Sequence, residues 1–100
     1  MAKPLSQTLK ILRDHQAALQ RRGVLHAAVF GSVARHEASE ESDVDILIDL
    51  DSTYPIGVFA YATLKLYINE LLGEKVDVVH RKTLKPLLRE SITRDAVHAF

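Results

Sequence analysis

The sequence lacks cysteine altogether, and its 13 basic residues are matched by 13 acidic ones, so it carries no net charge. Without cysteine, the chain forms neither disulfide bonds nor thiolate metal sites. A neutral chain is also a poor candidate for broad nucleic-acid binding, which needs a basic face that displaces counterions. The neutral net charge is compatible only with a small local contact with RNA.

Long apolar segments are missing as well. No apolar run approaches the ~20 residues that a membrane-spanning helix needs, and the first ten residues contain no apolar core of a secretory signal. The sequence shows no internal repeat, linker or low-complexity stretch. We therefore expect a soluble, cytoplasmic protein with one domain over residues 1–100, large enough to bury roughly 65% of its unfolded surface.

Apolar periodicity and turn residues predict the order of the elements. Leucines that recur on one face, with Pro4 at the start and Gly23 at the end, predict a long first helix. The expected elements are helices over 4–22, 57–72 and 84–94, and strands over 24–30, 43–50, 75–79 and 96–99. This order predicts a mixed α/β (α+β) fold, in which helices pack on a small twisted sheet.

The most informative stretch covers residues 29–51, VFGSVARHEASEESDVDILIDLD. Asp43 and Asp45 are two apart on a predicted strand, so both carboxylates should project from the same face. Two like charges held this close repel unless a cation lies between them, and oxygen ligands suit Mg²⁺. Because Mg²⁺ binds proteins mostly where a phosphate completes its shell, a phosphate site should adjoin the aspartates.

The Gly31-Ser32 turn can supply that phosphate site. It ends the first predicted strand and begins a short helix that reaches to about Glu37. Glycine allows a phosphate close to the backbone, and the free N–H groups of a helix start favour an anion. Arg35 lies about one helical turn after Ser32, so its guanidinium can pair with phosphate oxygens. Together the two halves predict a site for a metal-bound nucleoside triphosphate.

The combined motif is Gly31-Ser32, ten residues, then Asp43-Val44-Asp45. With Arg35 in its place, this motif resembles the signature of the DNA polymerase β-like nucleotidyltransferase superfamily. The short chain is most similar to the minimal nucleotidyltransferase (MNT) branch, whose members are often antitoxins paired with HEPN-domain toxins. One departure is His36, where the branch more commonly has glycine.

The resemblance implies the nucleotidyltransferase fold and a reaction in which AMP passes from ATP to a hydroxyl group. It assigns Asp43, Asp45 and Asp77 to a two-metal Mg²⁺ site, and Gly31, Ser32 and Arg35 to the phosphates of ATP. By position alone, Asp77 is either such a ligand or an exposed acid of an edge strand. The implied acceptor is a tyrosine of a HEPN-type toxin, which the chain would silence as an antitoxin, alone or as part of an oligomer.

Two other functions stay open at this stage. The chain could neutralise a toxin by contact alone, or transfer a nucleotide to a small molecule, although no added domain that would hold such an acceptor is apparent. The other polar residues support no separate site. Asp49 and Asp51 lack the glycine and glutamate of a calcium-binding loop, Glu40 and Glu41 are interpreted as solvated, and the five histidines lack metal-ligand spacing.

Overall fold

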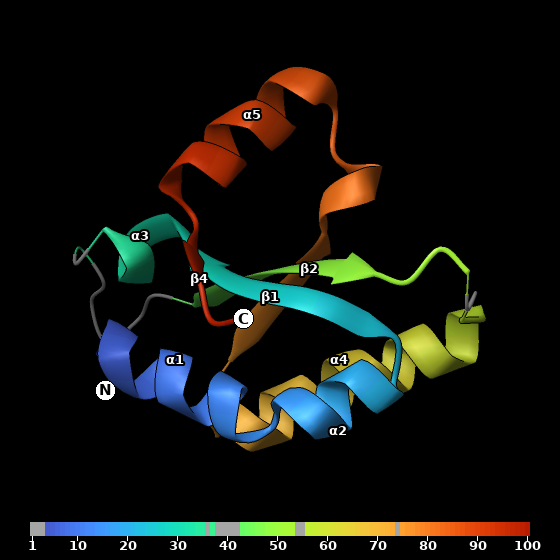
Figure 1. Ribbon diagram of the computed structural model, residues 1–100. Coiled ribbons are helices and arrows are strands. Elements are labelled where there is room, and N and C mark those ends of the chain that lie inside the picture. Colours follow the sequence, from blue (N-terminus) through green and yellow to red (C-terminus); the bar gives the residue numbers. More distant parts are fainter. Residues whose placement is uncertain (1–3, 36, 38–42, 54–55, 74) are drawn as a thin grey trace.

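The computed structural model describes residues 4–35, 37, 43–53, 56–73 and 75–100 (Figure 1). Predictions for the loop 38–42, including Glu40 and Glu41, and for His36 therefore lie outside the described residues. The elements in chain order are α1 (Leu5–Asp14), α2 (Gln16–Arg21), β1 (Val24–Phe30), α3 (Gly31–Ala34), β2 (Val44–Leu50), α4 (Val58–Leu72), β3 (Val76–His80), the 3₁₀ helix η1 (Arg81–Thr83), α5 (Pro86–Asp95) and β4 (Val97–His98).

The four strands form one mixed sheet in the order β3-β2-β1-β4. Strand β1 pairs antiparallel with both β2 and β4, whereas β2 and β3 run parallel. Helices α1, α2 and α4 lie against one face of the sheet, and α5 lies on the opposite side (Figure 1). The predicted small mixed sheet packed with helices is confirmed, including the short last strand.

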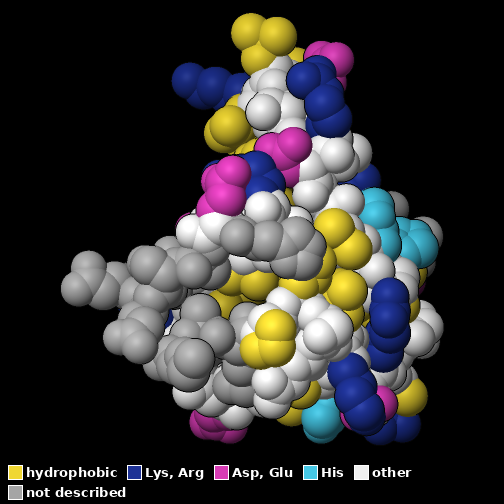
Figure 2. Space-filling model, turned by 90° about the vertical axis from the view of Figure 1, so that its left-hand side faces the viewer, with side chains coloured by type: hydrophobic (Ala, Val, Ile, Leu, Met, Phe, Trp, Pro, Cys, Tyr) yellow, Lys and Arg dark blue, Asp and Glu magenta, His cyan; other side chains and the backbone are white. Residues whose placement is uncertain are grey.

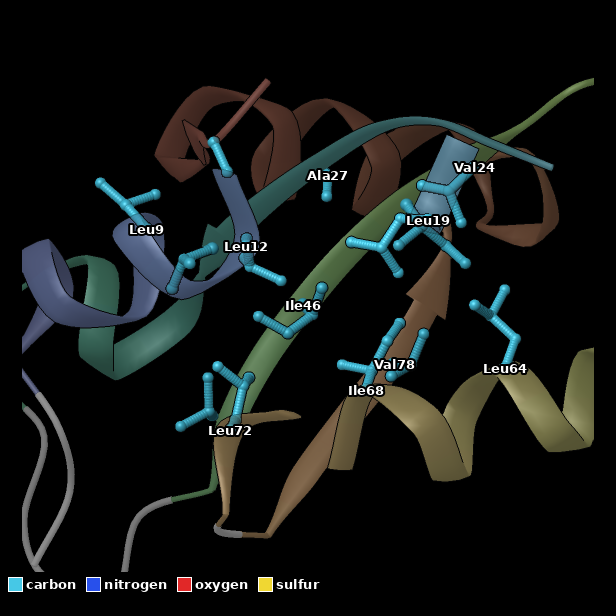
Figure 3. Packing of buried hydrophobic residues seen from close by; sticks show 14 of the residues in the cluster. Leu9, Leu12, Leu19, Val24, Ala27, Ile46, Leu64, Ile68, Leu72 and Val78 are labelled. Atoms are coloured by element: carbon cyan, nitrogen blue, oxygen red, sulfur yellow. The ribbon is translucent and has the colours of Figure 1, made fainter. Parts of the chain in front are cut away.

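The core lies between the sheet and the three helices on one side (Figure 3). Successive side chains of strand β2 point to opposite faces of the sheet. Val44, Ile46 and Ile48 belong to the core cluster, together with Leu12, Leu64, Ile68 and Leu72 of the helices. Asp45, Leu47 and Asp49 have the opposite parity, so they project from the face on the α5 side. The carboxylates are thereby kept out of the core.

The first predicted helix is wrong in one respect. It is two helices, because the chain breaks at His15, whose φ of −108° and ψ of 15° depart from helical values. The His15 ring Nδ1 lies 2.8 Å from the carbonyl oxygen of Ile11, and this local contact accompanies the break. The remaining predicted elements differ from the observed ones by a few residues at their ends, the largest difference being the short helix α3, which ends at Ala34. None of the described helices combines the length and the apolar character needed to cross a membrane.

Candidate active site

The register of the parallel pair places two of the predicted carboxylates side by side. Asp45 of β2 is the partner of Asp77 of β3. Paired residues on neighbouring strands project to the same face, so both carboxylates point to the side away from the main core. Asp43 precedes β2 by one residue and has the same parity as Asp45. Strand geometry thus assembles three acids from two distant parts of the sequence.

Gly31 lies directly against this group. On the antiparallel side, Phe30 pairs with Asp45, and Gly31 is the next residue along the chain. Gly31 has a φ of +74°, a conformation that residues with a side chain rarely adopt. A Cβ atom there would collide with the Asp45 carboxylate, coming within 3.1 Å even of its Cγ. The glycine is therefore required both for the turn and for the close approach of Asp45.

The electrostatics of Asp45 reflect this crowding. Burial raises the pKa of the Asp45 carboxyl group, and the neighbouring charges of Asp77 and Asp43 raise it further. Arg35 acts in the opposite direction and lowers the same pKa. The three acids and Arg35 are therefore close enough to interact, and the negative charge at Asp45 is incompletely balanced by the protein.

Arg35 is engaged by acidic side chains. Its Nε donates a hydrogen bond to Glu37 Oε2 at 3.1 Å, and its Nη1 lies 3.5 Å from Asp95 Oδ2 at the end of α5. On the face shown in Figure 2, acidic and basic side chains adjoin one another below the protruding helix α5. Asp43 has its own cationic neighbour, because Lys75 Nζ lies 3.9 Å from its Oδ2. Asp95 and Lys75 had no signal in the sequence, since each becomes a neighbour only through the fold, whereas Glu37 lies two residues after Arg35 along the chain.

The carboxylate oxygens of this group are donors that suit Mg²⁺. Among the residues that the structure describes, no three His, Cys, Asp or Glu side chains are arranged to hold a metal ion. Magnesium usually takes only one or two carboxylates from a protein, and substrate phosphates and water complete its shell. Asp45 with Asp43 or Asp77 meets that requirement in ligand type, and the raised pKa of Asp45 marks a carboxylate that a cation would stabilise.

Paired acids lie beside a glycine-serine turn on a mixed sheet covered by helices, which is the arrangement that the sequence motif predicts for a nucleotidyltransferase. The family model of the nucleotidyltransferase domain matches residues 5–98. The chain therefore belongs to the nucleotidyltransferase domain family, as its motif predicted.

Two relatives are similar over almost their whole length. Protein adenylyltransferase MntA of Thermococcus cleftensis is 37% identical over 95 residues, which cover 94% of each chain. MJ1217 of Methanocaldococcus jannaschii, provisionally assigned as a protein adenylyltransferase, is 39% identical over 98 residues, covering 96% of this chain and 98% of the relative. The prediction of a minimal nucleotidyltransferase is confirmed.

Solved structures agree with this assignment. A provisionally assigned minimal nucleotidyltransferase superimposes with a TM-score of 0.78 at 40% identity, and 95% of each chain is covered. A complex of tri-AMPylated Shewanella oneidensis HEPN toxin with its MNT antitoxin gives a TM-score of 0.63 at 15% identity, covering 92% of this chain and 71% of the other. A toxin–antitoxin structure with AMP-PNP gives 0.68 at 18% identity, covering 88% and 72%. The last two share the fold, and the nucleotidyltransferase fold expected from the sequence is confirmed.

Proposed function

We propose that this chain transfers AMP from ATP to a tyrosine hydroxyl of a HEPN-type toxin and thereby acts as a cytoplasmic antitoxin. The relative named MntA is a protein adenylyltransferase and is 37% identical along nearly the whole chain. Complexes of MNT antitoxins with HEPN toxins, one of them tri-AMPylated, share the fold. The observation that carries the proposal is the Asp45–Asp77 pair beside Gly31, since it places the acids next to the turn that we propose binds the phosphates.

In the proposed reaction, the acceptor oxygen forms a bond to the α-phosphorus of ATP. The bond between the α-phosphorus and the bridging oxygen breaks, and pyrophosphate leaves. Asp77 would accept the proton of the incoming hydroxyl group. Its pairing with Asp45 suits this role, because the base then lies next to the acids that face the phosphates.

The remaining site residues would hold and neutralise the nucleotide. Asp43, Asp45 and Asp77 are the proposed ligands of Mg²⁺, which when bound would offset the charge of the triphosphate. Backbone N–H groups after Gly31, the Ser32 hydroxyl and the Arg35 guanidinium would bind the β- and γ-phosphates. For Arg35 this requires exchange of Glu37 or Asp95 for a phosphate oxygen, which is feasible because its side chain is 46% exposed.

The test separates catalysis from neutralisation by contact. Purified chain and its toxin partner are incubated with labelled ATP and Mg²⁺, and both label transfer and toxin activity are followed. We expect wild type to label and silence the toxin, whereas a folded Asp43→Asn/Asp45→Asn double variant does neither. If the double variant silences the toxin as well as wild type does, neutralisation needs only contact. Label on a small molecule in place of the toxin would indicate the other alternative.

A further inference from the structure

A pair of adjoining cavities lies where β2 and β3 end. The larger, of about 570 Å³, has a mainly apolar wall that includes Leu50, Ile56, Val58 and Tyr61. The smaller, of about 250 Å³, has a basic wall that includes Arg81, Lys82 and Arg89. The two cavities share Leu50, Ser52, His80 and Lys82, so one ligand can occupy both.

These cavities lie at the other end of β2 from the candidate active site, although Tyr61 in the wall of the larger cavity is near enough to Asp77 for that charge to raise the pKa of its hydroxyl group. Leu50 follows Asp45 by five positions along β2, which corresponds to roughly 16 Å. In Figure 1, α3 and the beginning of β2 lie on the left, whereas β2 ends toward the right. None of the six residues assigned to ATP or Mg²⁺ lines either cavity. A ligand here would not occupy the position of the reacting phosphates.

The smaller cavity has the chemistry of an anion site. Three cationic side chains line it, against the single carboxylate of Asp49. Arg81 Nε forms an ion pair with Asp49 Oδ1 at 3.3 Å without hydrogen-bond geometry, and Arg89 Nη2 donates a hydrogen bond to the Leu84 carbonyl oxygen at 2.9 Å. Arg89 Nε is buried and has no hydrogen-bond partner among the described residues. A buried N–H group without an acceptor is unfavourable, and a phosphate oxygen of a ligand would accept its hydrogen bond.

The larger cavity suits an uncharged, flat group. Its size falls within the range of small-molecule pockets, whose walls are mainly apolar with a few polar groups. Tyr61 contributes an aromatic ring to the wall, and Lys65 Nζ lies 5.1 Å from the centroid of that ring. A nucleobase would stack on the part of the ring that Lys65 leaves open to the cavity. Burial raises the pKa of the Tyr61 hydroxyl group and the charge of Asp77 raises it further. Like any tyrosine hydroxyl at neutral pH it is protonated and can donate a hydrogen bond.

We infer that the two cavities form a second binding site for a free nucleoside monophosphate, with the phosphate among Arg81, Lys82 and Arg89 and the base beside Tyr61. The ligand class follows from the arrangement of one basic and one apolar compartment with a shared wall. This inference does not rest on the proposed transfer reaction.

The inference is tested by ¹⁵N NMR titration of the whole chain with AMP, without Mg²⁺. We expect saturable shifts of the amide signals of Leu50, Ser52, Lys82 and Thr83. Inorganic phosphate alone should shift the signals around Arg81 and Arg89, and adenosine alone those around Ile56 and Tyr61. The titration also separates the two proposals, because binding at the candidate active site would shift Gly31 and Ser32 instead.

Two variants with matched controls complete the test. Lys82→Gln removes an exposed charge, and Arg89→Gln removes a held guanidinium; each should weaken AMP binding about tenfold through loss of a charge-assisted hydrogen bond. Lys85→Gln and Arg94→Gln alter exposed residues that line neither cavity and should leave binding unchanged. The inference would be overturned by any of three results. The signals that shift could be confined to residues 31–35 and 45, no signal could shift, or Lys82→Gln could bind AMP with the affinity of wild type.

Discussion

At the scale of single residues, Asp45 connects the two halves of the site. It pairs with Asp77 on one side and with Phe30 on the other, and it lies against the backbone of Gly31. The absent side chain of Gly31 makes room for this carboxylate. Burial and the nearby acids Asp77 and Asp43 then make the negative charge of Asp45 costly. Each of these two properties leads to a prediction about stability.

Gly31→Ala should destabilise the fold by at least about 2 kcal/mol, because the added Cβ would strain a backbone of positive φ and displace the Asp45 carboxylate. Gly57→Ala is the matched control. Gly57 has a φ of −77° and open space around the position of a Cβ, so the change should be within about 1 kcal/mol of wild type. Urea unfolding of the three proteins measures the difference. Equal stability of the two variants would show that Gly31 does not crowd Asp45.

Asp45→Asn should raise the free energy of unfolding at pH 7. A carboxyl group whose pKa is raised in the folded state binds its proton more tightly there, so its ionisation costs stability as the pH rises above the ordinary value of 3.8 and through the higher folded value. Asparagine avoids this cost. The gain should stay below about 1 kcal/mol, because solvent screens a partly exposed group.

This second prediction is checked by measuring the free energy of unfolding of both proteins as a function of pH. The difference between Asp45→Asn and wild type should disappear as the pH falls below 3.8, where both forms are uncharged. Asp14→Asn is the control, since Asp14 Oδ2 accepts a hydrogen bond from Lys10 Nζ at 2.7 Å, and loss of this ion pair should not stabilise the protein at any pH. A variant at Asp45 that is less stable than wild type at pH 7 would contradict the repulsion described for the three acids.

At the scale of elements, Asn69 ties α4 to the strand that carries Asp77. Its side-chain oxygen accepts a hydrogen bond from the Val76 N–H at 3.0 Å, and its amide donates to the Lys65 carbonyl oxygen at 3.1 Å. The bond to Val76 holds the first residue of β3 in place. Because β3 carries Asp77 in its second position, the bond also helps to fix Asp77 opposite Asp45.

Asn69→Leu should therefore cost about 1–3 kcal/mol, since the Val76 N–H loses its partner. Hydrogen exchange at Val76 should accelerate more than exchange at Ile46 in the central strand. Thr63→Val is a control on the same helix, because it removes only an exposed hydroxyl that bonds to the Phe59 carbonyl oxygen. It should change stability by less than about 0.5 kcal/mol. Unchanged hydrogen exchange at Val76 in the Asn69 variant would show that the hydrogen bond from the Val76 N–H to Asn69 is not needed to hold the start of β3.

Local patterns in the sequence were sufficient to predict most elements. The alternation in β2 and the spacing of Asp43 and Asp45 act over a few residues, so their shared face follows from strand geometry. The break at His15 could not be predicted, because leucines continue the apolar face through it. Neither could the Arg35–Asp95 and Arg81–Asp49 pairs, since each joins segments that only the folded chain brings together.

Asp77 shows the limit for the candidate site. By position alone it had two interpretations, and the resemblance to nucleotidyltransferases selected one of them. The parallel register places Asp77 beside Asp45, although the two residues lie far apart along the chain. Which of the acids bind metal, and whether Arg35 leaves its acidic partners for phosphate, stay predictions.

At the scale of the whole molecule, the two ends of the sheet have different chemistry. Acids and a glycine-serine turn lie at one end, and a basic and an apolar cavity lie at the other. The family assignment concerns the entire sheet and its helices, since the matched region runs over residues 5–98. The proposed transfer reaction depends only on the acidic end.

The most direct test of that reaction is the intact mass of the toxin partner after incubation with this chain, ATP and Mg²⁺. We predict that its mass increases by one or more AMP groups, and that peptide mapping places them on a tyrosine. Asp77→Asn should abolish the increase, whereas Asp14→Asn, an exposed acid far along the sequence from the site, should leave it intact. A toxin of unchanged mass with wild type, or equal modification by folded Asp77→Asn, would contradict the account.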